Sequence, residues 1–224
     1  MSHSDAALLV VAGKPSREGA GLAAMPLRPT PSEMRSRIIE AAERLFRKFG
    51  YRKTTLADIA LALSMSPANI YRFFRSKHAI DEAVCRRLLG DPVSLAVELA
   101  QRNATAEDRL RGFFSAIVRF NVEQFRPNDA LHQLVATAAA EDWPALREYR
   151  DRMEFVLATI IADGMGRGEF PKVDARRAAR CVCTSMLQHL HPTPVVRVDR
   201  GQASLDDMLN FCLAALRHGE LSQD

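Results

Sequence analysis

The sequence predicts an all-α protein. Apolar residues recur at helical spacing along most of the chain, and Ser, Thr or Asp stands before several of these stretches, where it can cap a helix. The period-two alternation typical of half-buried strands does not continue over any useful length, and no repeat of roughly 20 to 50 residues is present. We therefore expect helices packed on helices.

The composition favours a soluble protein over a membrane or exported one. Hydrophobic residues make up 47% of the 224 residues, which is ample for a buried core. No apolar run approaches the roughly 18 residues that span a bilayer. The apolar residues 6 to 13 are too short for a signal-peptide core and follow no basic segment. We expect a cytoplasmic protein without a membrane partner.

No cofactor, metal site or catalytic group is predicted. The four cysteines lack the CxxC spacing of zinc sites and are interpreted as small core residues. His189 and His191 are two positions apart, so on a helix they point in different directions. The chain also lacks a convincing pair of acids or an activated nucleophile. An enzyme is therefore not expected.

The N-terminal part predicts a tail followed by a long helix. Residues 1–29 mix Gly, Ala, Pro and Ser without sustained periodicity, which is typical of a disordered tail. Thr30, Pro31 and Glu33 have the order of a cap, a first-turn proline and a capping-box acid. The broad apolar stripe that follows ends at Gly50, a natural helix terminator.

Residues 54 to 77 predict two short helices joined by a tight turn. Thr55 and Asp58 have capping-box spacing before a helix over residues 56 to 63. Ser66 is the cap of the next helix, with Pro67 at its first position. Two short helices joined by a three-residue turn are a helix-turn-helix candidate.

The positive charge of the chain is concentrated around this candidate. Residues 28–77 carry eleven Lys and Arg residues against four acids, a net charge of +7, whereas the rest of the chain carries −3. A concentrated positive field is expected for a polyanion partner, because neutralising phosphates releases counterions. A solvated basic face without a partner is the alternative.

The remainder predicts a helical body. Ser76 can cap a fourth helix, and Pro92 predicts a break or kink before more helix through Leu99, because proline removes a backbone donor. The apolar and capping patterns then predict further helices in the following places: from Thr105 to Phe125, over residues 128–140, from after the turn Asp142-Trp143-Pro144 to Gly164, from Asp174 to Leu190, and from Ser204 to His218.

The residues of this region follow one another in a specific order and spacing: Thr54-Thr55, Ile59-Ala60, Leu63-Ser64-Met65, Ser66, Tyr71, Phe74 and Lys77. With these features the segment from 33 to 80 resembles the DNA-binding segment of the TetR family of bacterial transcriptional regulators. One departure is Ser64, where the family usually has glycine, so the turn must form without the residue that most easily takes positive φ.

The resemblance implies a three-helix helix-turn-helix DNA-binding domain at residues 30–77, then a helical ligand-binding and dimerisation domain at 78–224. The second helix of such a motif enters the major groove. The positions implied to face bases are Pro67, Ala68, Asn69, Tyr71 and Arg72. Those implied to contact phosphates are Thr55, Ser66, Tyr71 and Lys77.

Two further sites are expected in the body. Rings and thioethers at helical spacing could line an effector pocket, which the resemblance favours, or fill a solid core. The candidates are Phe113, Phe114, Ile117, Phe120, Trp143, Tyr149 and Met153. The last two long helices have apolar faces wider than one neighbour can cover, and in TetR-like proteins such helices form a dimeric bundle. The expected interface residues are Val182, Met186, Leu190, Leu205, Met208, Leu209, Cys212 and Leu216.

These observations predict a homodimeric DNA-binding transcriptional regulator, most simply a repressor. It would bind a palindromic double-stranded DNA operator and be released by an unidentified small-molecule effector. The alternatives are an all-helical interaction module whose basic face contacts an acidic protein, and a helical-bundle enzyme, for which no constellation is found.

Overall fold

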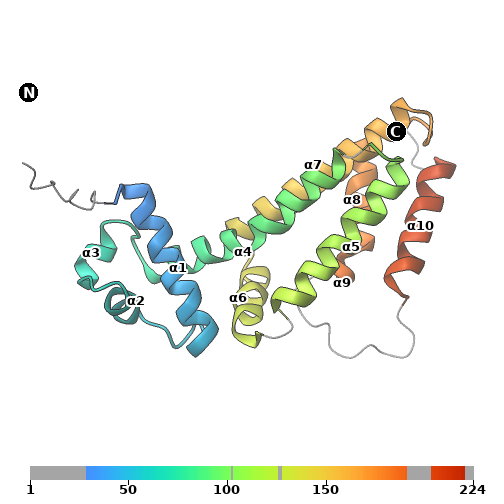
Figure 1. The fold of residues 1–224 in the computed structure, drawn as a ribbon. Coiled ribbons are helices and arrows are strands. Elements are labelled where there is room, and N and C mark those ends of the chain that lie inside the picture. Colours follow the sequence, from blue (N-terminus) through green and yellow to red (C-terminus); the bar gives the residue numbers. More distant parts are fainter. Residues whose placement is uncertain (1–28, 102, 126–127, 191–202, 220–224) are drawn as a thin grey trace, which may run out of the picture.

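The computed structural model describes residues 29–101, 103–125, 128–190 and 203–219, and every regular element within them is a helix (Figure 1). The predicted tail falls outside the described residues, apart from Pro29. The helices are α1 (Pro31–Phe49), α2 (Leu56–Ala62), α3 (Pro67–Tyr71), α4 (Lys77–Ala100), α5 (Ala106–Phe125), α6 (Asp129–Ala140), α7 (Pro144–Gly166), α8 (Ala175–Ser185), α9 (Leu187–Leu190) and α10 (Leu205–His218).

Helices α1, α2 and α3 form a small head at one end of an elongated molecule (Figure 1). The predicted capping box of α1 is confirmed, because the Thr30 side chain accepts from the Glu33 amide while the Glu33 carboxylate accepts from the Thr30 amide. Apolar side chains from all three helices meet in the middle, including the fully buried Phe46, Ile59 and Ile70. The head therefore has its own apolar centre.

Helix α4 connects the head to the body as one continuous helix, so of the break or kink predicted at Pro92 the break is wrong. Proline in a helix interior costs about 3 kcal/mol through its missing donor and its ring clash. The buried residues Leu88 and Leu89 before Pro92, and Val93 and Ala96 after it, belong to the same apolar core. Packing on both sides of the proline favours one continuous helix.

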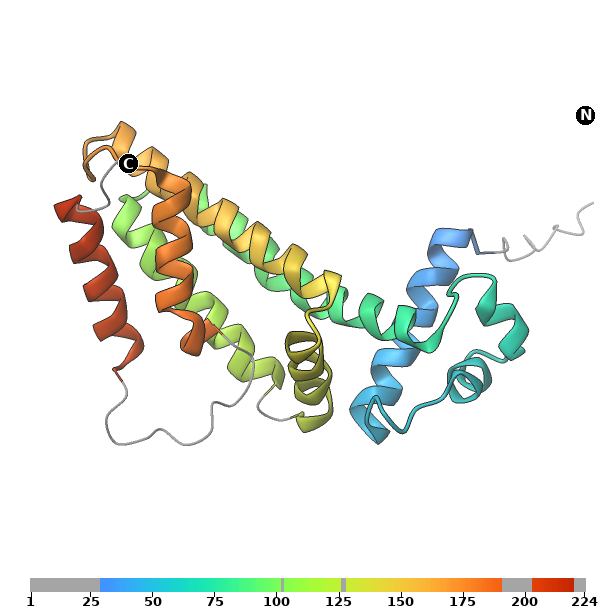
Figure 2. The ribbon, with the colours of Figure 1, turned by 180° about the vertical axis from the view of Figure 1, so that it is seen from behind.

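The body is a layered bundle in which α4 and α5 pack against α7, and α8 packs on the other side of α7 (Figures 1 and 2). The segment predicted as one helix from Asp174 to Leu190 is divided into α8 and α9. The Ser185 hydroxyl donates to the Cys181 carbonyl oxygen at 2.9 Å, a side-chain bond that commonly bends a helix. None of the described helices is long and apolar enough to cross a membrane.

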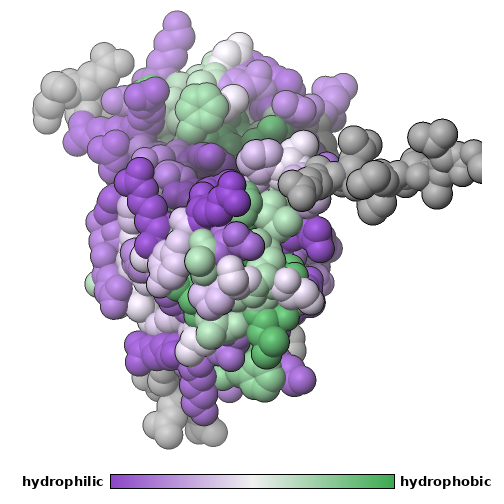
Figure 3. All heavy atoms as spheres, turned by 90° about the vertical axis from the view of Figure 1, so that its left-hand side faces the viewer, coloured by the Kyte–Doolittle hydropathy of each residue, from purple (hydrophilic) through white to green (hydrophobic). Residues whose placement is uncertain are grey.

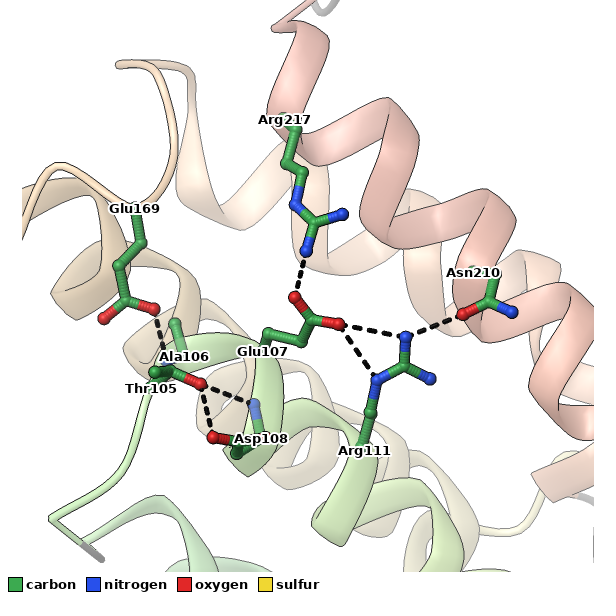
Figure 4. Close-up of polar contacts among 8 residues, drawn as sticks. All are labelled: Thr105, Ala106, Glu107, Asp108, Arg111, Glu169, Asn210 and Arg217. Atoms are coloured by element: carbon green, nitrogen blue, oxygen red, sulfur yellow. Dashed lines mark hydrogen bonds and ion pairs between the residues drawn. The ribbon is translucent and has the colours of Figure 1, made fainter.

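Helix α10 lies beside α8 and is joined to the start of α5 by charged side chains (Figure 4). Glu107 of α5 accepts hydrogen bonds from Arg217 of α10 and from Arg111, and Arg111 also donates to Asn210 of α10 at 2.6 Å. These contacts are partly exposed, so they contribute little to the free energy of folding. Their main effect is to fix the orientation of α10 against α5.

Candidate DNA-binding interface

The turn between α2 and α3 depends on Ser64. Its φ of 54° lies in the left-handed region, which glycine adopts most easily. The Ser64 amide donates to Leu61 O at 3.0 Å and the Met65 amide donates to Ala60 O at 2.8 Å, so the backbone closes the end of α2. Serine therefore takes the conformation for which the family usually has glycine.

Side-chain caps fix the starts of both helices of the motif. Thr55 Oγ1 accepts from the Asp58 amide at 3.2 Å, and the Asp58 carboxylate accepts from the Thr55 amide at 2.8 Å and from the Thr55 hydroxyl. The bonds from Thr55 hold the pKa of Asp58 below its usual value. Ser66 Oγ accepts from the Asn69 amide at 3.3 Å, which confirms the predicted cap of α3.

All five side chains predicted to face bases are exposed: Pro67, Ala68, Asn69, Tyr71 and Arg72. Ile70 is the buried residue of α3 and turns the opposite side of the helix towards the head core. Seen from the head end, hydrophilic residues cover much of the surface (Figure 3). Among the described residues, helix α3 therefore presents an exposed face with Asn69, Tyr71 and Arg72 on it, which can meet a groove of DNA.

Lys77 is the first residue of α4, and its side chain contacts the head. Its ammonium group donates to Tyr51 O at 3.0 Å and to the Asp81 carboxylate, and it lies 4.6 Å from the centre of the Phe46 ring. Burial raises the pKa of Asp81, and the bond from Lys77 opposes this effect. Without DNA the ammonium group of Lys77 holds the start of α4 against the head, and the phosphate role of Lys77 stays a prediction.

Replacing Lys77 by methionine is expected to lower the free energy of unfolding by about 1–3 kcal/mol at neutral pH, because the buried Asp81 carboxylate loses its charged donor. The pKa of Asp81 would then rise further, so the folded state would bind a proton more readily than the unfolded state and the loss would shrink as pH falls. Urea unfolding at pH 8 and pH 5, at one protein concentration, checks this.

Lys53→Met, at an exposed lysine of the same head, is the control for the loss of a positive charge and should change stability by less than about 0.5 kcal/mol. A Lys77→Met protein that keeps its stability but loses about one unit of the salt slope of DNA binding would instead support the phosphate role.

Two residues of the head were missed by sequence reasoning. Arg35 of α1 donates to Phe73 O, and its guanidinium lies 4.2 Å from the centre of the Phe74 ring, so it holds the end of the motif against α1. The Tyr51 hydroxyl lies 2.6 Å from Thr137 Oγ1 of α6, which joins the head to the body. Neither belongs to the motif pattern, and both contacts join residues far apart in the chain.

Most of the side chains expected to line a pocket are buried in the apolar core. Phe113 and Phe114 are fully buried and packed edge to face with ring centres 5.0 Å apart, and Ile117 is fully buried beside them. Trp143 packs against His78 of α4. Phe120 is half-buried and packs on the same core. These side chains therefore belong to the apolar core of the body, and their place in an effector pocket stays a prediction.

Tyr149 and Met153 do line a cleft of about 440 Å³. The cleft lies between the end of α6, the first half of α7, and α8 with α9. Its lining consists of Ala139, Leu146, Tyr149, Arg150, Met153, Glu154, Arg180, Cys183, Thr184, Leu187 and Leu190.

Most of the predicted dimer-interface residues are buried within the chain. This holds for Val182, Met186, Leu190, Leu209, Cys212 and Leu216, while Leu205 and Met208 are half-exposed. Helices of the same chain cover these six residues, and their contact with a second copy stays a prediction. The large apolar side chains left in solvent on these helices are Leu187, 52% exposed, and Phe211, 67% exposed.

A capped α2, a tight turn and an exposed α3 on a basic head define a helix-turn-helix DNA-binding protein. Residues 38–84 match the family model described as "Bacterial regulatory proteins, tetR family", and residues 106–206 match "Tetracyclin repressor-like, C-terminal domain". The chain belongs to the TetR family of bacterial transcriptional regulators. It is therefore a regulator of transcription and not an enzyme.

Relatives of similar length support this assignment. The chain is 33% identical to the HTH-type transcriptional regulator BetI of Rhizobium meliloti, covering 83% of this chain and 92% of BetI. It is 30% identical to the HTH-type transcriptional regulator TtgR of Pseudomonas putida, covering 66% and 73%. The fold is similar to Thermus thermophilus FadR in complex with lauroyl-CoA, with a TM-score of 0.60, 21% identity, and coverage of 85% and 96%.

Proposed function

We propose that this regulator binds a palindromic operator as a homodimer, represses transcription there, and is released by a small-molecule effector. The head at 30–77 reads the DNA, and the body at 78–224 binds the effector and the second copy. The regulator would act in the cytoplasm. The observation that carries the proposal is the exposed polar face of α3 on the basic head.

Each α3 side chain has a distinct role in this proposal. Asn69 has an amide that can pair bidentately with adenine, and Arg72 can reach guanine or a phosphate. Tyr71, 54% exposed, contacts the backbone or a base edge, while the hydroxyls of Thr55 and Ser66 donate to phosphates as they cap their helices. Arg75 and Arg52, both exposed, add positive charge around them.

Dimerisation would use the exposed face of α8 and α10. Phe211 is its large apolar side chain, and Ala214 and Ala215 on the same helix are small and exposed, which lets a second helix approach. A two-fold dimer presents two heads to two half-sites, which matches a palindromic operator. A small molecule that binds more tightly to the dimer conformation whose heads do not fit two half-sites would favour that conformation. It would thereby lower the affinity of the dimer for DNA.

Operator binding is tested with duplex DNA from the intergenic region upstream of the gene, titrated against a scrambled duplex of the same composition. Asn69→Ala and Arg72→Ala are each expected to weaken binding to the natural duplex by about 5- to 150-fold, corresponding to about 1–3 kcal/mol, and to reduce preference over the scrambled duplex. Arg119→Ala removes an exposed arginine of α5 and should leave affinity unchanged.

Equal affinity of the wild-type protein for the natural and the scrambled duplex would count against operator recognition. Wild-type affinity in a double Tyr71→Ala and Arg72→Ala protein would count against the α3 assignment. Sedimentation of Phe211→Arg against wild type tests the interface, since a charge in a covered apolar face is expected to shift the protein to monomers.

A further inference from the structure

The cleft between α6, α7, α8 and α9 contains a polar group that the protein leaves without a partner. Tyr149 is 9% exposed, and its hydroxyl makes no hydrogen bond to any residue in the part of the chain that the structure describes. An acceptor on a molecule in the cleft could therefore take the hydrogen bond that the Tyr149 hydroxyl is able to donate. Burial raises the pKa of Tyr149, so the hydroxyl remains protonated and able to donate.

The rest of the lining sets the character of a ligand. Leu146, Met153, Leu187 and Leu190 give the cleft apolar walls, and about 440 Å³ is within the range of small-molecule sites. Burial also raises the pKa of the Cys183 thiol to about 12, so it contributes no negative charge. The walls therefore favour apolar ligand surface.

The charges at the rim are already balanced. Arg180 pairs with Glu154 at 3.1 Å, and Arg150 pairs with Asp142. An anionic ligand would have to break one of these pairs to gain an arginine, which reduces any benefit from its charge. Balanced rim charges favour a neutral ligand.

We infer that this cleft is an effector site for a neutral, mostly apolar molecule with one hydrogen-bond acceptor, such as a carbonyl oxygen, which the Tyr149 hydroxyl donates to. The inference rests on the proposed function for its regulatory meaning, but the binding site itself does not depend on it. Tyr149 sets the position of the acceptor, and the apolar walls supply most of the affinity.

The cleft is close to a contact between the body and the head, so a bound ligand could affect the position of the head. Ala139 lines the cleft near the end of α6, and Thr137, two residues earlier on the same helix, lies 2.6 Å from the Tyr51 hydroxyl of the head. A ligand that displaces the end of α6 would therefore change a contact that positions the head.

Matched probes test the site. Benzophenone carries a carbonyl between two rings, and diphenylmethane has nearly the same shape without the acceptor. Isothermal titration of the full chain should show that Tyr149→Phe weakens benzophenone binding by about 3- to 10-fold, as expected for one lost hydrogen bond, and changes diphenylmethane binding by less than about 2-fold. The thermal midpoint of Tyr149→Phe should equal that of wild type, because the hydroxyl has no protein partner.

Three further results bear on the inference. Ala139→Leu, which narrows the cleft, should weaken both probes. Benzophenone photocrosslinking should label cleft residues such as Met153. 4-Benzoylbenzoate, the carboxylate analogue, should bind no more tightly than benzophenone. Tighter binding of the anion, equal loss of both probes in Tyr149→Phe, or exclusion of both probes by a second copy that fills the cleft would overturn the inference.

The coupling to DNA is a separate readout. Thr137→Val should keep benzophenone affinity within about 2-fold while reducing the effect of benzophenone on operator affinity. Probes that bind as described to a chain without operator preference would refute the proposed function and leave the site intact. Operator binding by a chain that binds neither probe would refute the ligand site and leave the proposed function intact.

Discussion

Phe113→Ala is expected to lower the free energy of unfolding by about 3–5 kcal/mol. The ring is fully buried and packs edge to face on Phe114, so its removal loses apolar burial and leaves a cavity that the bundle cannot fully close. Urea unfolding at one protein concentration measures the change, since the apparent stability of a dimer depends on concentration. The folded fraction at physiological temperature should fall with it.

Phe155→Ala, at a phenylalanine that is 65% exposed on α7, is the matched control and should change stability by less than about 0.5 kcal/mol. A loss below about 1 kcal/mol in Phe113→Ala, together with new binding of apolar compounds, would instead mean that Phe113 borders an open pocket. That result would support the pocket prediction made from the sequence.

The parts of the fold that depend on neighbouring residues could be predicted from the sequence. Thr30, Thr55, Ser66 and Ser204 each accept from a backbone amide three residues later, as their spacing predicts. Ser64 shows the limit of such rules, since the turn needs a positive φ and the surrounding structure imposes it on a serine. Capping residues in the sequence therefore predict where helices begin, even where a neighbouring turn contains a residue that disfavours the required φ.

The contacts that the sequence did not predict are set by packing. The place of Lys77 in the motif gives no sign that its ammonium group donates to Tyr51 O, far back in the chain, and to Asp81, one turn further along α4. Pro92 would end an isolated helix, but the packing of α4 on α5 and α7 offsets its cost. An apolar face on α8 or α10 predicts burial without saying whether the same chain or a second copy covers it.

The loss of Asp163 from its ion pair with Arg109 is expected to lower the stability of the bundle strongly. Arg109 of α5 is 6% exposed; it donates to Ala100 O at the end of α4 at 2.8 Å and to the Asp163 carboxylate of α7. Its Nε has no hydrogen-bond partner among the described residues. A buried guanidinium is costly unless it is paired, so the neutralising carboxylate should matter more than the arginine itself.

Asp163→Ala is therefore expected to lower the free energy of unfolding by about 3 kcal/mol, because it leaves the buried charge of Arg109 uncompensated. Arg109→Met keeps an apolar stem in the same space and should stay within about 1 kcal/mol of wild type. The double variant should resemble Arg109→Met alone. Urea unfolding of the three proteins gives the coupling energy of the pair.

Arg167→Ala provides the control, because Arg167 also pairs with Asp163, at 3.0 Å, but is 43% exposed at its side chain. An exposed pair contributes about 0.2–1 kcal/mol, so this variant should stay within that range. Additive losses in the double variant would show that Arg109 and Asp163 stabilise the bundle separately. A loss from Arg109→Met as large as that from Asp163→Ala would show that the arginine stabilises the junction of α4, α5 and α7 in its own right, through its bond to Ala100 O.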